Sequence, residues 1–159
     1  MVCPVSNRTS ADKILLLSVD TKPDLSRCSQ LRQLEIVTTY PEEQERILIS
    51  SITSANLEKI IFKPFNIQSL QFFLGDPCWI HFDNMLYGLV DRLRTSGLKH
   101  TLEVEFQLTS AEFGEEVYHG DFLPMFKEKG RVRMVNIFSG KVREWPCSNE
   151  LECSARNGV

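Results

Sequence analysis

The chain has 159 residues, of which 42% are hydrophobic and 25% are charged, a balance typical of one soluble globular domain rather than of a disordered or fibrous chain. Its net charge of −3 and isoelectric point of about 5.7 exclude a global attraction to nucleic acid or to an anionic membrane. The longest apolar run, residues 14–19, is interrupted by Ser18 and is too short to span a bilayer.

The cysteines indicate a reducing compartment. Their number is odd, their spacings are irregular and no Cys-x-x-Cys pair occurs, so reduced thiols are the simplest interpretation. The first ten residues are polar and contain no apolar segment of signal-peptide length. We therefore expect a cytoplasmic or nuclear protein, with residues 1–12 forming a flexible N-terminus.

A triplet spaced apolar–x–x–apolar–x–apolar recurs along the chain, and leucine-rich repeats form their short strands from this pattern. The four triplets are Ile14, Leu17 and Val19; Leu31, Leu34 and Ile36; Leu57, Ile60 and Phe62; and Val132, Val135 and Ile137. With a further strand predicted at 101–106, the successive starts fall roughly 17, 26, 44 and 31 residues apart. Only one of these intervals lies within the usual repeat period of about 20–29 residues, so the array is irregular.

The segment between the second and third triplets is predicted to be a helix. Pro41 suits the first turn, where its missing N–H is not needed, and three glutamates follow at the end where the helix dipole is positive. Asn56 readily adopts the left-handed conformation that ends a helix, so we expect the helix to end there. The segment 21–30 is interrupted by Pro23, and we expect a loop or one short turn.

Residues 63–81 form a long apolar insertion that leaves two interpretations open. In the first, its aromatic side chains fold back and cap the core, because small solenoids need their flanks covered. In the second, an exposed aromatic patch binds a protein. The candidate protein-binding residues of this patch are Phe72, Phe73 and Trp79.

Two further helices are predicted after the insertion. An apolar stripe with helical spacing predicts a helix that ends at Gly97, and its members are Phe82, Met85, Leu86, Leu89, Val90 and Leu93. A shorter helix is predicted from Asp121, an N-cap residue type, to Gly130.

The strand at 101–106 alternates cleanly, with Leu102, Val104 and Phe106 facing one way and two glutamates facing the other. One face of the sheet is therefore expected to meet water or a protein partner. The candidate protein-binding residues on that face are Gln33, Glu35, Lys59, Ile61, Glu103 and Glu105.

Charge is segregated along the second half of the chain. Residues 101–126 contain six acids and no lysine or arginine, whereas residues 127–143 contain six basic residues and one acid. The two glutamates of 101–106 would pair with Arg131 and Arg133 in a structural ladder if Val132 and Met134 faced the core. If the triplet buries Val135 and Ile137 instead, the segregation favours a bipolar surface that steers a charged partner.

Together these elements predict an α/β fold. We expect an irregular leucine-rich-repeat-like solenoid fragment over residues 13–143, with about five mostly parallel strands, helices on one face and the insertion at 63–81. Residues 144–159 are expected to form an irregular C-terminal tail.

No catalytic motif accompanies this scaffold. The sequence has no Gly-x-Ser-x-Gly elbow, no phosphate-binding loop and no dinucleotide fingerprint. Its three histidines are spaced evenly, but even spacing has no meaning for metal binding without a structural repeat of that length. We expect no catalytic, cofactor or metal site and no enzymatic activity. Because the net charge is negative and no apolar segment is long enough, we expect neither a nucleic-acid partner nor a membrane.

The sequence resembles the C-terminal leucine-rich-repeat-like region of basidiomycete fungal F-box proteins. The resemblance covers roughly residues 15–143 and is carried by the blocks LLSVDTKPDLSRCSQLRQLEI, ERILISSITSANLEKIIF, LVDRLRTSGLKHTLEVEF and FLPMFKEKGRVRMVNIFSGKV. In that family an F-box near the N-terminus docks on the linker protein of a cullin-type ubiquitin ligase, and the repeats are taken to select the ubiquitination substrate.

This chain departs from the family at its start, because no leucine–proline-led helical F-box block precedes residue 15. The resemblance therefore implies only the repeat scaffold and a non-enzymatic, substrate-recognition type of protein binding. The ligase linker protein is an expected partner only if an F-box is encoded upstream. The alternatives are a truncated gene product without a function of its own and, less favoured, a small hydrolase.

Overall fold

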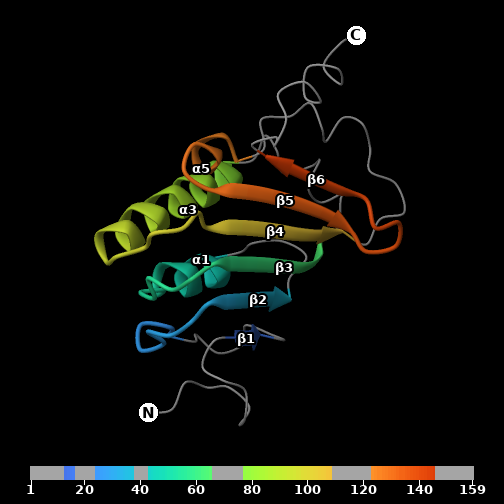
Figure 1. Cartoon of the computed structure of the whole chain (residues 1–159). Coiled ribbons are helices and arrows are strands. Elements are labelled where there is room, and N and C mark those ends of the chain that lie inside the picture. Colours follow the sequence, from blue (N-terminus) through green and yellow to red (C-terminus); the bar gives the residue numbers. More distant parts are fainter. Residues whose placement is uncertain (1–12, 17–23, 38–42, 66–76, 109–122, 146–159) are drawn as a thin grey trace.

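The computed structural model describes residues 13–16, 24–37, 43–65, 77–108 and 123–145. These residues form an α/β structure with one six-stranded sheet, whose strands lie side by side in chain order (Figure 1). The strands are β1 (Lys13–Leu16), β2 (Gln33–Val37), β3 (Lys59–Phe65), β4 (Glu103–Leu108), β5 (Arg131–Asn136) and β6 (Val142–Trp145). The helices are α1 (Glu43–Ser50), α3 (Pro77–Thr95) and α5 (Pro124–Lys127).

Strands β1 to β5 are parallel, which confirms the α/β class and the predicted parallel pairing. Strand β6 returns antiparallel along β5 after a hairpin. We did not expect this strand, and it corrects the boundary of the irregular tail, because residues 144 and 145 belong to the sheet.

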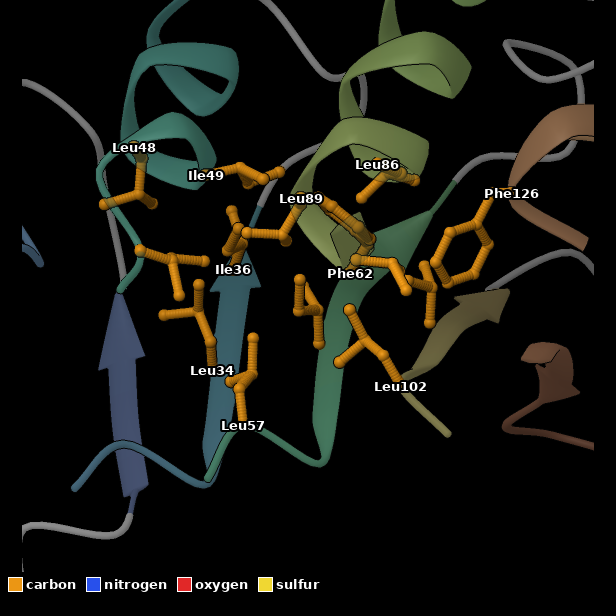
Figure 2. Close-up of a cluster of buried hydrophobic side chains, with 14 of the residues drawn as sticks. Leu34, Ile36, Leu48, Ile49, Leu57, Phe62, Leu86, Leu89, Leu102 and Phe126 are labelled. Atoms are coloured by element: carbon orange, nitrogen blue, oxygen red, sulfur yellow. The ribbon is translucent and has the colours of Figure 1, made fainter. Parts of the chain in front are cut away.

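The core lies between one face of the sheet and the described helices. Fully buried, inward-facing apolar residues of β2 to β5 form this layer, and they are Leu34, Ile36, Ile60, Phe62, Val104, Phe106, Leu108, Val132 and Met134. Figure 2 shows strand residues of this layer meeting Leu48 and Ile49 of α1 and Leu86 and Leu89 of α3. Phe62 stacks on Phe106 with ring centroids 5.2 Å apart and meets the edge of Phe82 at 5.5 Å. Aromatic pairs in such geometries add to the free energy of burial.

The register corrects two of the four triplets. Residue Ile14 pairs with Leu34, and Val132 pairs with Val104, so both outer triplets were aligned three positions away from the true register. Successive strands are offset by 20, 26, 44 and 28 residues. At β5 strict alternation holds, because Val132 is fully buried whereas Ile137 is 50% exposed.

Helix α3 confirms the apolar stripe and the end at Gly97, whose φ of 112° is costly for residues with a Cβ. It begins at Pro77, so residues 77–81 belong to this helix rather than to the predicted insertion. Residues 63–65 continue β3, and residues 66–76 lie outside the described part of the chain.

Helix α1 ends at Ser50, earlier than predicted from Asn56. The Ser50 and Ser51 hydroxyls donate to carbonyl oxygens of the preceding turn, a bond that competes with helix continuation. The Asn56 side chain donates to the carbonyl oxygen of Ser29, so it fixes the loop against its neighbour instead of capping the helix.

The short helix α5 begins at Pro124, and the predicted cap Asp121 lies outside the described residues. Its N-terminus is capped from α3, because the buried Asp83 carboxylate accepts hydrogen bonds from the N–H groups of Met125 (3.0 Å) and Phe126 (2.8 Å). A Cβ at Gly130 would collide with the Phe126 ring, so a glycine is required there.

Two local features complete the fold. The register between β3 and β4 shifts between Phe62 and Phe65, and Pro64 lies within this shift, where its missing N–H is tolerated.

Cys28 is buried and disulfide-bonded, so the expectation of reduced thiols is wrong at this residue. Among the described residues, no helix is long and apolar enough to cross a membrane.

Candidate protein-binding face

The side of the sheet that faces away from the described helices carries most of the predicted binding residues. We call it the polar face. Register places its side chains in rows that run across the strands, because residues paired between parallel neighbours point the same way. Its members are Gln33, Glu35, Val37, Lys59, Ile61, Lys63, Glu103, Glu105, Gln107, Arg131, Arg133, Val135, Val142 and Glu144.

Glu105 is the centre of this face. One carboxylate oxygen, Oε2, lies 2.5 Å from Lys59 Nζ of β3 and 3.3 Å from Arg133 Nη1 of β5. The other oxygen accepts a hydrogen bond from Gln107 Nε2 at 2.9 Å. A single carboxylate therefore links three neighbouring strands.

A similar arrangement surrounds Glu35 on β2. Its Oε1 accepts a hydrogen bond from Gln33 Nε2 at 2.7 Å, and its Oε2 lies 2.6 Å from Lys63 Nζ. Ile61 stands between the two carboxylates, since register pairs it with Glu35 on one side and Glu105 on the other. The row therefore reads carboxylate, apolar side chain, carboxylate across three strands. Each carboxylate accepts a hydrogen bond from a glutamine amide and lies beside at least one cation.

Three of the predicted binding residues on the polar face are more buried than we expected. Glu35, Ile61 and Glu105 are only 4%, 5% and 5% exposed, although we expected them to be open to a partner. The lysine, arginine and glutamine donors that surround the carboxylates explain how the charges are tolerated there. The polar-face candidates that keep a partly exposed side chain are Gln33, Lys59 and Glu103.

The network sets the charge state of its central groups. Burial raises the pKa of Glu105, but its hydrogen bonds with Gln107 and Lys59 and the charges of Lys59 and Arg133 outweigh burial, so the pKa lies below its ordinary value. Burial lowers the pKa of Lys59, but its bonds to Glu103 and Glu105 outweigh it and leave the pKa raised. Both groups are therefore held in their charged forms.

The structure favours the ladder over the bipolar surface. The pair of Glu105 and Arg133 forms as the ladder predicts, whereas Glu103 contacts Lys59 at 2.8 Å and Arg131 stays exposed. Arg133 Nε also lies 3.2 Å from Glu144 Oε1, but without the alignment of a hydrogen bond. Acids and bases that are segregated in sequence thus alternate on the polar face.

The described residues include one of the three predicted aromatic candidates. Phe72 and Phe73 lie outside the described residues. Trp79 belongs to the first turn of α3, on the helix layer. The described part of the chain therefore tests neither interpretation of residues 63–81, the cap over the core or the exposed patch that binds a protein.

Two donors of the polar face, Lys63 and Gln107, were not predicted from the sequence. Lys63 was assigned to the insertion, and Gln107 follows the strand that we ended at residue 106. A glutamine two positions from a glutamate on the same strand shares its face and was the available signal for both carboxylates.

Groups of three or more histidine, cysteine or acidic residues that could hold a metal ion are absent from the described residues. His100 is occupied by a hydrogen-bonding contact of 2.8 Å between its Nε2 and the carbonyl oxygen of Leu57.

Searches against family models, curated proteins and solved structures found no match.

Proposed function

We propose that this chain is a non-enzymatic protein-binding domain of the leucine-rich-repeat-like type, which holds a partner through the polar face. One observation carries the proposal. The strands follow chain order in one parallel sheet, with the described helices on one side and an ordered array of polar side chains on the other. Parallel sheets are usually covered on both faces, so a polar second face fits a surface used for contact.

The offsets between strands support a repeat architecture. Three of the four, 20, 26 and 28 residues, fit the usual leucine-rich-repeat period of about 20–29 residues. Equivalent positions of two units also touch across 26 residues, as Leu25 N does with Ser51 Oγ at 2.9 Å. Arg32 and Glu58, again 26 residues apart, form an ion pair. Stacked repeats bring equivalent positions together in this way.

The polar face offers a partner hydrogen-bonding groups that are already fixed in place. Gln33, Lys59 and Glu103 are partly exposed, and the buried Glu35 and Glu105 hold two of them by hydrogen bonds or ion pairs. Fixing a polar side chain before binding lowers the entropy that is lost when the complex forms. Positive and negative groups alternate, which favours a partner of mixed charge.

The resemblance to F-box proteins names the kind of partner. We propose a ubiquitination substrate, with the ligase linker protein added only if an F-box is encoded upstream of Met1. A cytoplasmic or nuclear location belongs to the same proposal, and the Cys28 disulfide weighs against it because reducing compartments keep most thiols free.

The test is site-specific photo-crosslinking in cells that express the full chain. A photoreactive residue replaces Gln33 or Val135 on the polar face, and the matched control carries it at Asn84, an exposed position of α3. The crosslinked protein is identified, purified and titrated against Gln33→Arg, Val135→Arg and Asn84→Arg variants.

We expect the same protein to crosslink from both polar-face positions and not from Asn84. Its affinity should fall by about tenfold in the two polar-face variants, because a long cation replaces a fitted group. Equal crosslinking from Asn84, or equal affinities in all three variants, would remove the polar face as the binding surface. Circular dichroism of each variant checks that the fold is kept.

A further inference from the structure

The edge of the sheet at which β2 to β5 begin is formed by four loops that lie side by side (Figure 1). Backbone bonds join them in series: Glu58 N donates to Arg32 O, Glu103 N donates to Glu58 O, and Arg131 N donates to Leu102 O. Helix α3 ends at the same edge. We call this surface the basic edge, and it consists of residues 24–32, 50–58, 91–102 and 127–131.

The basic edge has a charge opposite to that of the whole protein. It contains eight lysines and arginines and four acids, a net charge of +4, in a chain whose net charge is −3. The remaining residues must therefore carry −7. Such a separation gives the edge a local positive potential that the net charge of the chain conceals.

The cations of the basic edge are held by two kinds of contact, ion pairs and hydrogen bonds to carbonyl oxygens. Arg32 pairs with Glu58, and Lys129 pairs with Asp91. Arg92 and Arg94 donate instead to the carbonyl oxygens of Ser50 and Lys129, contacts that fix their position but do not remove a full charge.

Two more cations, Arg27 and Lys99, are exposed on loops of this edge. Arg27 lies in the loop that precedes β2 and Lys99 in the loop that precedes β4, so they are carried by different loops of the same surface. A charged partner can therefore contact several loops at once.

The side chains of the basic edge argue against nucleic acid and membrane as its partner. Binding of single-stranded nucleic acid uses aromatic platforms, but the four ranges contain no phenylalanine, tyrosine or tryptophan, and the neighbouring Tyr87 ring lies under the Lys129 ammonium at 3.8 Å. Membrane binding needs exposed apolar side chains beside the cations. The exposed large apolar residues of the described chain lie outside the four ranges, at Ile47, Ile80, Met125, Ile137, Phe138 and Val142.

We propose that the basic edge binds an acidic protein segment rich in aspartate and glutamate. Carboxylates on a flexible segment can reach cations that are spread over several loops. The four acids of the edge lie among these cations and would repel an evenly spaced row of phosphates, so a segment with separated negative charges fits the edge better. This inference goes beyond the proposed function, since the surface is a sheet edge and does not need the polar face to be occupied.

The experiment titrates the full chain into a fluorescently labelled polyglutamate peptide and follows fluorescence anisotropy at low and at physiological ionic strength. Lys99→Glu is the test variant. Lys141→Glu is the matched control, because it makes the same exchange at an exposed position of the β5–β6 hairpin, at the opposite end of the strands. The double variant Arg27→Glu/Lys99→Glu brings the net charge of the edge to zero.

We expect the native chain to bind the peptide, with an affinity that falls as salt is added. Lys99→Glu should weaken binding about threefold and the double variant about tenfold, whereas Lys141→Glu should change it less than about twofold. Absence of binding by the native chain, or an equal loss in Lys141→Glu, would overturn the proposal. It would also be overturned if a single-stranded oligonucleotide or phosphatidylserine vesicles bound more tightly than the peptide and were equally sensitive to Lys99→Glu.

Discussion

The two faces of the sheet bury their central residues by different means. On the helix side, Phe62 is fully buried among other aromatic rings and needs no polar partner. On the polar side, Glu105 is buried almost as completely, but Lys59 and Arg133 of the two neighbouring strands and Gln107 of its own strand compensate its charge. The burial of Phe62 depends on the shape and volume of the side chains around it. The burial of Glu105 depends on strand register, because a slip of one strand would separate its carboxylate from the donors on the neighbouring strands.

The comparison shows that low exposure in this sheet has two energetic meanings. Removal of a core side chain leaves a cavity, which costs several kcal/mol. Removal of one partner from a polar network leaves the other polar groups buried without a partner, and stability falls by their desolvation free energy. This loss is smaller than that of a core cavity where water can reach the groups. Substitutions on the two sides of the sheet should therefore lower the free energy of unfolding by different amounts.

Phe62→Ala is expected to lower the free energy of unfolding by about 3–5 kcal/mol, because it removes contacts with two other rings. The neighbouring Ile61→Ala is the control on the opposite face and should cost about 2 kcal/mol. Urea unfolding followed by circular dichroism measures both. Equal losses would mean that the polar face is packed as tightly as the core.

Asp83→Ala is expected to cost about 1–3 kcal/mol, because it leaves the N–H groups of Met125 and Phe126 without their acceptor. The adjacent Asn84→Ala, at an exposed position, should change stability by less than about 0.5 kcal/mol. Differential scanning calorimetry compares the two variants. A small effect of Asp83→Ala would show that α5 does not depend on its cap from α3.

Glu105→Gln is expected to cost about 1–2 kcal/mol at neutral pH, because Lys59 and Arg133 lose a charged partner. The folded-state pKa of Glu105 is lowered, so its stabilisation is present above its unfolded pKa of about 4.3 and is lost as pH falls through the folded value. The stability difference between native chain and variant should therefore shrink in acid. Urea titrations at several pH values measure it, and a difference that is constant with pH would contradict the assignment.

The Arg32–Glu58 ion pair should give the smallest effect. Both side chains are about half exposed, and exposed pairs couple by about 0.2–1 kcal/mol. A double-mutant cycle with Arg32→Ala and Glu58→Ala measures the coupling, which should decrease further in high salt. A coupling as large as the Glu105→Gln effect would show that the repeat-like loops are a major source of stability.

The sequence predicted the helix side of the sheet better than the polar side. The stripe of α3 and the triplets that begin at Leu31 and Leu57 are determined by apolar periodicity, which the helix and strand geometries impose directly. The triplet at Val132 failed because its spacing also fits an alternating strand, and only pairing with β4 decides between the two.

The polar face was harder to predict for a physical reason. Alternation shows that Glu35 and Glu105 share a side with Lys59, but their burial depends on donors that arrive from other strands at the correct register. The cap that Asp83 provides for α5 has the same origin, since 42 residues separate it from Met125. Such contacts leave no periodic signal in the sequence.

The strand order also has a consequence for folding. Each parallel strand pairs with the next one along the chain, so every new pairing closes a loop of one unit rather than of the whole domain. Assembly can therefore proceed outward from a first pair, one unit at a time, as in linear arrays. We expect the pair of β3 and β4 with α3 to form this nucleus, because its aromatic cluster holds the largest buried side chains.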